Sequence, residues 1–308
     1  MKTKIFILIV ALVSNYIINQ DTVTEKSFLI KNGNIELPGT LTYTKNSNKL
    51  IIWVHGSGNV DRNGNQAGYN VKANYIKQFR DEVNEKGIAF FSYDKRTSNP
   101  KNAAFLKGII LDDYVSDVKT VVQHFKNENQ FKEIILIGHS QGSLIAMLAS
   151  EKIDKYISLA GPSETIEQTI VKQITNQSAD LGKIAANHFN ELKETGNIKN
   201  INPNLVTVFA KPNFPFFRNW LSYNPVNEIK KLNLPTLIIN GTKDIQVSVD
   251  NAKALHLAHK NSQLKIIENM NHVLKYIQKD EDNLSSYYSP DYKISIELIE
   301  TITEFIKK

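Results

Sequence analysis

The sequence of 308 residues contains no cysteine. It therefore forms no disulfide bond and offers neither a thiolate nucleophile nor a cysteine ligand for a metal. It also lacks a basic block interleaved with aromatic residues. The net charge is +6 and the pI about 9.1, but lysines and acidic residues are scattered along the chain. Nucleic acid is therefore not an expected partner.

The composition is that of a globular protein, with 41% hydrophobic and 22% charged residues. A chain of this size suits one α/β domain with an insertion, and it is long enough to bury a substantial core. No internal repeat or low-complexity tract is visible. No group of histidines and carboxylates has the spacing of metal ligands, so no metal site is expected.

The N-terminal stretch 1–20 differs from the rest. Lys2 and Lys4 precede an apolar run over 5–13, which has signal-peptide length and is too short to span a bilayer comfortably. We expect a cleaved signal peptide and export to the periplasm or the extracellular space, with no stable membrane partner afterwards. Leu12 and Ser14 make a weak cleavage site, so an N-terminal anchor and a buried hydrophobic strand remain alternatives. The sequence does not indicate the oligomeric state.

Short apolar runs alternate with helical patterns through most of the chain, which predicts a mostly parallel sheet covered by helices on both faces. The stretch 27–44 predicts an antiparallel hairpin with a turn at Asn32-Gly33. Strands are expected at 50–54, 88–93, 134–137, 156–160, 234–240 and 264–267, and helices at 72–86, 111–127, 143–149, 249–259 and 294–306. The stretch 279–292 is polar and is predicted to be a loop.

The sequence around Ser140 has the pattern of a nucleophile elbow. A buried strand leads into Gly138-His139-Ser140-Gln141-Gly142, and a helix of small and apolar residues follows. The turn is tight, so its central residue is expected in a strained backbone conformation, and Gly138 and Gly142 avoid a collision by lacking Cβ atoms. A Gly-rich turn with an incidental serine is the alternative.

A serine hydroxyl needs a base to accept its proton and a carboxylate to orient that base. Asp244 directly follows one buried strand and His272 follows the last strand, so nucleophile, acid and histidine occur in the order typical of this scaffold. Asp250 is a weaker candidate acid, and a turn-capping role is the alternative for Asp244. The other histidines fit less well, and His139 is expected to point away from the site.

The tetrahedral intermediate requires two backbone N–H donors for its oxyanion. One is expected from Gln141, the residue after the nucleophile. The other is expected from the loop His55-Gly56-Ser57-Gly58, from Ser57 or alternatively from Gly58. An ordinary tight loop is the alternative for this motif.

Two charged loops follow predicted strands, Asp61-Arg62 and Asp94-Lys95-Arg96. We interpret them as paired charges that brace the loops. A direct contact of Arg62 or Arg96 with substrate is the alternative.

Between the two parts of the predicted core the pattern changes. The stretch 163–225 holds helix-like segments and an aromatic-rich region over 203–224. It is predicted to be a cap or lid that walls a substrate pocket, inserted between core segments 21–162 and 226–308. Packing of an extra helical layer explains the same pattern equally well.

Taken together, these motifs resemble the α/β-hydrolase superfamily of serine hydrolases, and more narrowly the bacterial EstD-like carboxylesterases, which lie near the serine aminopeptidase-like hydrolases. The resemblance covers most of 27–308. It rests on HGSGNVDRNG, GIAFFSYDKRTSNP, GHSQG, LAGPS, LPTLIINGTKDIQV and NMNH. Asn59 departs from the family pattern, in which a proline is common, without affecting a catalytic position.

The resemblance implies an α/β-hydrolase fold with a helical cap, and hydrolysis of short to medium acyl esters through an acyl-enzyme without a cofactor. The positions of Ser140, Asp244, His272 and Gln141 match those of the family's catalytic groups. A small-molecule ester is then the expected substrate. An exported prolyl- or aminopeptidase-type enzyme, a thioesterase and a carbohydrate O-acetyl esterase remain alternatives, as does a catalytically silent ligand-binding protein. A peptidase would need an anionic site for the substrate amine, for which Glu164 and Glu167 are candidates.

Overall fold

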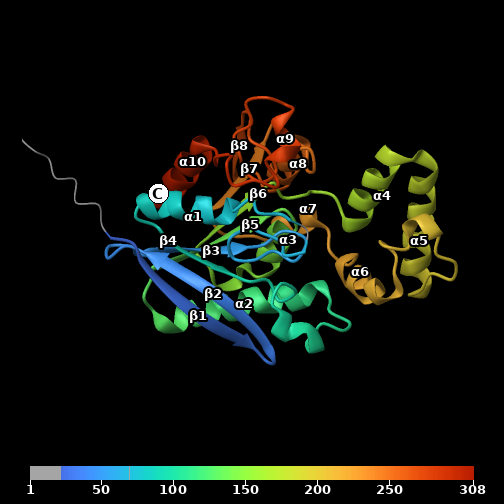
Figure 1. The fold of residues 1–308 in the computed structure, drawn as a ribbon, viewed down its shortest axis with the longest axis horizontal. Coiled ribbons are helices and arrows are strands. Elements are labelled where there is room, and N and C mark those ends of the chain that lie inside the picture. The colour runs from blue at the N-terminus through green and yellow to red at the C-terminus, as the bar shows by residue number, and fades with distance from the viewer. Residues whose placement is uncertain (1–21, 69) are drawn as a thin grey trace, which may run out of the picture.

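The computed structural model describes residues 22–68 and 70–308, so the predicted signal peptide lies outside the described residues. Its centre is an eight-stranded sheet in the order β1-β2-β4-β3-β5-β6-β7-β8 (Figure 1). The strands are β1 (Thr24–Asn32), β2 (Ile35–Tyr43), β3 (Lys49–Val54), β4 (Ala89–Tyr93), β5 (Glu133–His139), β6 (Lys155–Leu159), β7 (Thr236–Gly241) and β8 (Gln263–Ile267).

The direction of the strands confirms the predicted sheet. β1 pairs with β2 and β2 with β4 in antiparallel fashion, and every pairing from β4 through β8 is parallel. The hairpin register differs slightly from expectation, since Asn32 pairs with Ile35. The two turn residues are therefore Gly33 and Asn34, and Gly33 has a φ of 59°, a value that glycine adopts without steric cost.

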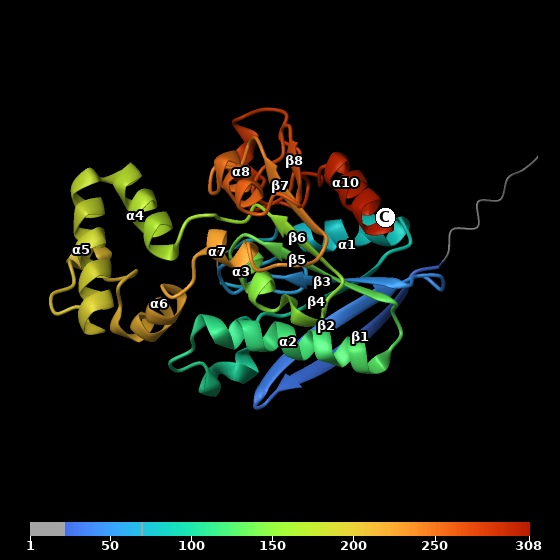
Figure 2. The same cartoon turned by 180° about the vertical axis from the view of Figure 1, so that it is seen from behind.

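Helices cover both faces of the sheet (Figures 1 and 2). One face carries α1 (Tyr75–Glu85) and α10 (Ile296–Lys307), whose apolar side chains share a core with the sheet. The other face carries α2 (Leu111–Glu128), α3 (Gln141–Leu148), α7 (Pro225–Ile229) and α8 (Val249–Ala258), around a second core. Helices α1, α2, α3, α8 and α10 agree with the predicted ones to within a few residues, whereas the short helix α7 was not predicted.

Strand β3 shows why the central strands are continuously apolar. Ile51 and Trp53 point into one core, while Leu50, Ile52 and Val54 point into the other. Successive side chains of a strand alternate between faces, so a strand that is covered on both sides needs apolar residues at every position. The carboxyl ends of the parallel strands meet at one edge, where the predicted site residues follow β3, β4, β5, β7 and β8.

The insertion between β6 and α7 contains α4 (Ile166–Gln177), α5 (Ala179–Thr195) and α6 (Phe214–Trp220), and it lies to one side of the sheet (Figure 1). It has a core of its own, in which the rings of Phe189 and Phe209 lie 4.9 Å apart and those of Phe189 and Phe217 lie 5.5 Å apart. The aromatic residues thus pack an additional helical layer. The division of the chain at 163–225 stays a prediction.

The stretch 279–292 is not entirely a loop, because it contains the short helix α9 (Asp282–Ser285). The side chain of Asn271 donates hydrogen bonds to Asn283 Oδ1 and Ser286 Oγ, and thereby ties this segment to the loop after β8. A short helix held by polar tertiary contacts carries no apolar periodicity, so the sequence pattern could not predict it. The remaining helical turns are of 3₁₀ type, over Pro100–Phe105, Ser150–Lys152, Pro203–Leu205 and Lys211–Asn213. No helix within 22–68 and 70–308 is both long and apolar enough to cross a membrane.

Candidate active site

Ser140 occupies the sharp turn between β5 and α3. Its φ of 55° and ψ of −124° lie outside the ordinary regions for a residue with a side chain, as the elbow pattern predicts. A Cβ on Gly138 would lie 2.3 Å from the carbonyl oxygen of Gly142, and one on Gly142 would lie 2.2 Å from that of Val54. The two glycines are therefore required for strand and helix to meet at this angle.

The second part of the site is an imidazole–carboxylate pair. His272 Nδ1 lies 2.8 Å from Asp244 Oδ2, and the side chains of His272 and Asp244 are 5% and 0% exposed. The other carboxylate oxygen of Asp244 accepts the backbone N–H groups of Gln246 and Val247, each at 2.8 Å. A proton on Nδ1 leaves Nε2 of a neutral imidazole free to accept another. Asp244 thus caps a turn and orients His272 at once.

Asp250, the weaker candidate acid, is placed differently. It lies in the first turn of α8, its side chain is 80% exposed, and it pairs with Lys253 at 3.2 Å. It makes no hydrogen bond with His272 among the interactions of the described residues.

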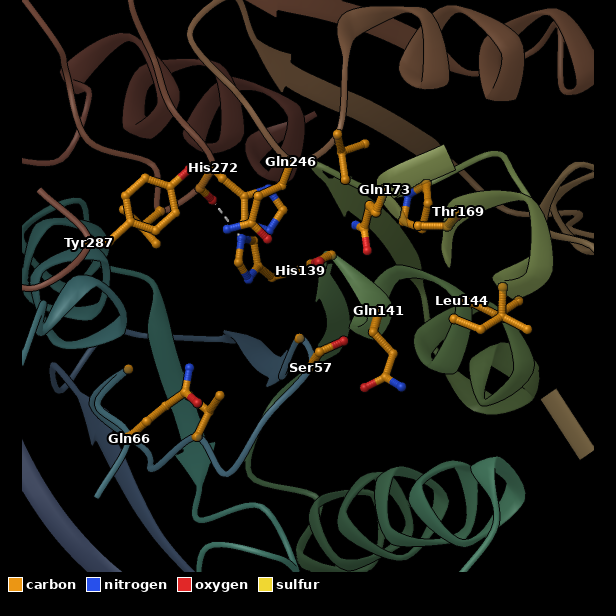
Figure 3. Close-up of a pocket in the computed structure, with 18 of the residues that line it drawn as sticks. Ser57, Gln66, His139, Gln141, Leu144, Thr169, Gln173, Gln246, His272 and Tyr287 are labelled. Atoms are coloured by element: carbon orange, nitrogen blue, oxygen red, sulfur yellow. Dashed lines mark hydrogen bonds between the residues drawn. The ribbon is translucent and has the colours of Figure 1, made fainter. Parts of the chain in front are cut away.

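Ser140 and His272 line the same pocket, which has a volume of about 540 Å³. Figure 3 shows side chains that surround this pocket: His272 and Tyr287 come from the C-terminal segment, and Thr169 and Gln173 from α4 of the insertion. Apolar residues of the insertion contribute as well, namely Ile166, Ile170, Phe217 and Trp220. The insertion therefore walls the pocket in addition to packing around its own core.

The predicted oxyanion donors meet at this pocket. Gly56, Ser57 and Gln141 are among the lining residues, and Ser57 and Gln141 are labelled in Figure 3. A Cβ on Gly56 would lie 3.1 Å from Ser140 Cβ, so the loop after β3 packs directly against the candidate nucleophile. Gly58 lies outside the lining that the described residues form, which favours Ser57 over Gly58.

Comparison with known proteins places this chain in a family. The sequence profile of the BD-FAE family matches residues 39–259, which is more than half of the chain. The chain belongs to the BD-FAE family.

Relatives of known structure share the fold of this BD-FAE member. Est1E from Butyrivibrio proteoclasticus is 20% identical with a TM-score of 0.56, and the match covers 92% of this chain and 99% of that one. The Pyrococcus furiosus esterase Pf2001 is 17% identical with a TM-score of 0.60, and the match covers 93% and 91%. The expected α/β-hydrolase fold is confirmed.

A curated relative supports the expected resemblance to EstD-like proteins. Esterase EstD from Thermotoga maritima is 26% identical over 269 residues, which cover 82% of this chain. The chain spans 62% of the length of that relative.

In this BD-FAE chain, His55 anchors the loop after β3 to the end of β4. Its Nε2 donates to the carbonyl of Tyr93, the last residue of β4. Burial lowers the pKa of His55 to about 4, so the ring is neutral at ordinary pH. His55 therefore joins the loops that follow β3 and β4, a structural role that suits its place in the HGSG motif.

The prediction for His139 was wrong. Its side chain lines the pocket, and its ring centroid lies 4.9 Å from that of His272 (Figure 3). His139 Nε2 donates to the carbonyl of His272 at 2.7 Å, and Nδ1 lies 3.4 Å from the hydroxyl of Tyr75. Burial lowers the pKa of His139 to about 3, so it acts as a neutral link. No signal in the sequence marks this role, because it depends on a residue far along the chain.

The charged loops brace the site largely as predicted. Arg62 forms a two-pronged ion pair with Asp94 at 2.9 and 2.6 Å, and Arg96 forms one with Asp117 at 2.7 and 2.8 Å. The two arginines are thus held by carboxylates, and neither lines the pocket formed by the described residues. Lys95 does not follow this rule: no ion pair joins it to a carboxylate anywhere in 22–68 or 70–308.

The two glutamates considered for an amine-binding site are already paired. Glu164 lines the pocket but accepts a hydrogen bond from Lys172 at 2.9 Å, and Glu167 pairs with Lys193 at 2.9 Å. Neither presents an unpaired negative charge to a substrate amine. Within the described residues, no group of three or more histidines and acids is placed to hold a metal ion.

Proposed function

We propose that this protein is an exported serine carboxylesterase that cleaves short to medium acyl esters through an acyl-enzyme. One observation supports the proposal most directly: the strained Ser140 lines one pocket together with His272, which Asp244 holds at 2.8 Å. Membership of the BD-FAE family and similarity to Esterase EstD support it.

In the proposed first half-reaction, His272 Nε2 accepts the proton of Ser140 Oγ, which attacks the ester carbonyl carbon. The carbonyl oxygen becomes an oxyanion and accepts hydrogen bonds from the N–H groups of Gln141 and Ser57. Asp244 stabilises the resulting imidazolium through the 2.8 Å contact with Nδ1. His272 then returns the proton to the leaving alcohol as the carbon–oxygen bond breaks.

The second half-reaction mirrors the first. Water enters, His272 accepts one of its protons, and the hydroxide attacks the acyl-enzyme carbonyl. Collapse of the second tetrahedral intermediate releases the carboxylic acid and returns the proton to Ser140. All these steps use groups of the chain and water, so we propose no cofactor.

The pocket supports a small ester as substrate. Its volume of about 540 Å³ falls within the range of roughly 300–1,000 Å³ that is usual for small-molecule sites. Its wall offers apolar surface from Ile170, Phe217 and Trp220 beside the amides of Gln173 and Gln246. This mixture suits an acyl chain of limited length attached to a polar alcohol.

The rival functions have less support. The two glutamates considered for the amine site of a peptidase are already engaged by Lys172 and Lys193. A carbohydrate O-acetyl esterase or a thioesterase would use the same catalytic groups and differs only in substrate. A silent ligand-binding protein would not need both the strained Ser140 and the buried Asp244–His272 pair.

Export is proposed from the N-terminal stretch 1–20 alone. Expression of the full chain in a bacterial host, fractionation and N-terminal sequencing test it. A mature N-terminus close to residue 21 in the periplasm or the medium is expected. A full-length protein that remains cell-bound would contradict cleavage and export.

Catalysis is tested with p-nitrophenyl esters from acetate to octanoate and with methyl ferulate, because a solved structure of the structural relative Est1E contains ferulic acid. The chain from residue 21 is compared with Ser140→Ala. Turnover that falls by roughly 10³-fold or more in the variant is expected. If no ester is hydrolysed and a serine-reactive phosphonate fails to label the protein, the proposal is wrong.

A further inference from the structure

Lys95 is a buried lysine beside the candidate site, and within 22–68 and 70–308 it pairs with no acid. It follows β4, is 5% exposed, and its ammonium lies 4.6 Å from the centre of the Tyr114 ring. Nζ donates to the carbonyl oxygen of Gly56 at 2.7 Å and to Oε1 of Gln141 at 3.1 Å. Burial of an unpaired ammonium is costly, which suggests that its contacts serve the site.

The first contact bears on the predicted oxyanion donor of Ser57. The carbonyl of Gly56 and the N–H of Ser57 belong to one peptide unit, and in a trans peptide they point in opposite directions. No cis peptide bond occurs in the described residues. A hydrogen bond from Lys95 to this carbonyl therefore fixes the direction of the N–H. A cationic donor on the carbonyl also polarises the unit and makes its N–H a stronger donor.

The second contact bears on the other donor. Gln141 supplies its backbone N–H from the first residue of α3, while its side-chain oxygen accepts from the same ammonium. One group thus connects the loop after β3 with the start of α3. These two segments must keep a fixed separation if both N–H groups are to reach one oxygen atom.

We propose that Lys95 is a positioning residue that holds the two halves of the oxyanion hole, Ser57 and Gln141, in register for the tetrahedral intermediate. The inference rests on the proposed function, because it assigns a role within that mechanism. Lys95 touches neither substrate nor nucleophile in this arrangement and acts only through the two donors.

Among the described residues, the charged and titratable neighbours of Lys95 are neutral or paired with other groups. Tyr93, Tyr114 and His55 face it from β4, α2 and the loop after β3. His55 is neutral, and the neighbouring carboxylates Asp94 and Asp117 are held by Arg62 and Arg96. Of the described cations in this cluster, Lys95 is therefore the one that no carboxylate holds, and it is available to stabilise the loop carbonyl.

The test compares Lys95→Met with Lys155→Met in the full chain. Lys155 is a control of similar burial: it is 8% exposed, donates to the carbonyl of Ile306 at 2.9 Å, and lies 6.0 Å from the Phe305 ring. Unlike Lys95 it also pairs with a carboxylate, that of Glu133 at 3.2 Å. It stands at the start of β6, at the edge of the sheet opposite Ser140. The readouts are kcat and KM for p-nitrophenyl acetate, inhibition by a trifluoromethyl ketone, and thermal unfolding.

Trifluoromethyl ketones add to an active serine and place an anionic oxygen in the oxyanion hole, so their affinity reports on its geometry. Lys95→Met is expected to lower kcat roughly 10- to 100-fold, to leave KM within about threefold, and to weaken ketone inhibition by the same factor as kcat/KM. Lys155→Met is expected to change each of these by less than about threefold. Equal effects of the two variants would overturn the proposal, as would a loss of kcat without a loss of ketone affinity.

A second variant covers the case in which Lys95→Met fails to fold. Gln141→Leu keeps the backbone donor but removes the acceptor for Lys95, and it is expected to lower kcat roughly fivefold to twentyfold at unchanged KM. An unchanged kcat in this variant overturns the role of the second contact. In the double variant, the two effects are expected to be less than additive because they act through one interaction.

The lack of cysteine permits a rescue. Lys95→Cys carries the sole thiol of the chain, and its alkylation with 2-bromoethylamine in the unfolded state, followed by refolding, restores an ammonium at nearly the same reach. At least about a tenfold recovery of kcat is expected relative to the same variant treated with iodoacetamide. Equal rates after the two treatments contradict the proposal. The unaltered chain is tested first. If it hydrolyses no ester and a phosphonate does not label it, both the proposed function and this inference are overturned.

Discussion

His139 Nε2 donates a hydrogen bond of 2.7 Å to the backbone carbonyl of His272. The donor belongs to the last residue of β5 and the acceptor to the loop after β8, so this contact connects the residue beside the candidate nucleophile with the candidate base. Both side chains are buried. The separation of Ser140 and His272 is therefore set by a direct link as well as by the sheet.

This relationship predicts the effect of His139→Leu. The variant leaves the carbonyl of His272 without its buried donor, which costs about 1–3 kcal/mol of unfolding free energy. The loop of His272 also loses a fixed point, so kcat for p-nitrophenyl acetate is expected to fall roughly tenfold. Urea unfolding and steady-state kinetics measure the two effects. A variant with unchanged kcat would show that the sheet alone positions the loop.

The pairing of Asp244 with His272 predicts a contrast between two aspartates. Asp244→Asn keeps the shape but favours the wrong tautomer of His272, and kcat is expected to fall by roughly 10³- to 10⁴-fold. Asp250→Asn is the matched control, since Asp250 lies exposed in α8 and pairs only with Lys253 among the described residues. It is expected to retain normal rates. Comparable losses in both variants would contradict the assignment of the acid.

The elbow predicts a stability difference between two glycine substitutions. A Cβ at Gly142 would meet the carbonyl oxygen of Val54 at 2.2 Å, so Gly142→Ala must displace a backbone segment. We expect it to lower the unfolding free energy by more than about 3 kcal/mol. Gly108 has a φ of 73° but open space around the added atom. Gly108→Ala is therefore expected to cost only about 1 kcal/mol. Similar midpoints in urea for both variants would contradict the packing at the elbow.

Much of this architecture could be predicted from the sequence. The apolar run of β3 and the helical spacing of α2 require only local periodicity. Ser140 is recognised from a strand–turn–helix motif with glycines two positions on either side. Asp244 and His272 are recognised because each follows a later predicted strand. The lack of a Cβ at Gly138 and Gly142 could be expected for the same reason.

Other features depend on tertiary contacts, and the sequence pattern does not predict them. His139 bonds to a carbonyl 133 positions away, and α9 is held by Asn271 through its amide. The role of Lys95 could not be predicted, because the sequence does not reveal which residue of Asp94-Lys95-Arg96 lacks a partner of opposite charge. Its acceptors are a backbone carbonyl and an amide oxygen, and neither leaves a mark in the charge pattern.

The burial of Lys95 predicts a pH dependence of stability. Burial lowers its pKa from 10.5 to about 7 in the folded protein. Between these two values the unfolded chain binds more protons than the folded one, so stability rises with pH across this window. The free-energy cost of burying the Lys95 ammonium is complete at pH values below its pKa in the folded protein, and it is absent above its pKa in the unfolded chain. The unfolding free energy of the wild type, relative to Lys95→Met, is therefore expected to increase by a few kcal/mol from pH 6.5 to pH 10. A constant difference would contradict the shift.

The same titration predicts a change in activity of the opposite sign. A neutral amine holds the carbonyl of Gly56 less strongly than an ammonium does, so kcat is expected to decline as the pH rises past about 7. This alkaline decline should be missing from the pH profile of Lys95→Met, whose kcat is already low. Persistence of the same decline in the variant would assign it to another group.

The central claim is that Ser140 is the nucleophile and that His272 activates it. Its most direct test is the reaction of the folded chain with a fluorophosphonate, followed by peptide mass spectrometry. We predict a single adduct, on the peptide that contains Ser140, with none in Ser140→Ala and labelling slowed by roughly 10³-fold in His272→Ala. Labelling of a different residue, or none in the unaltered chain, would contradict the account.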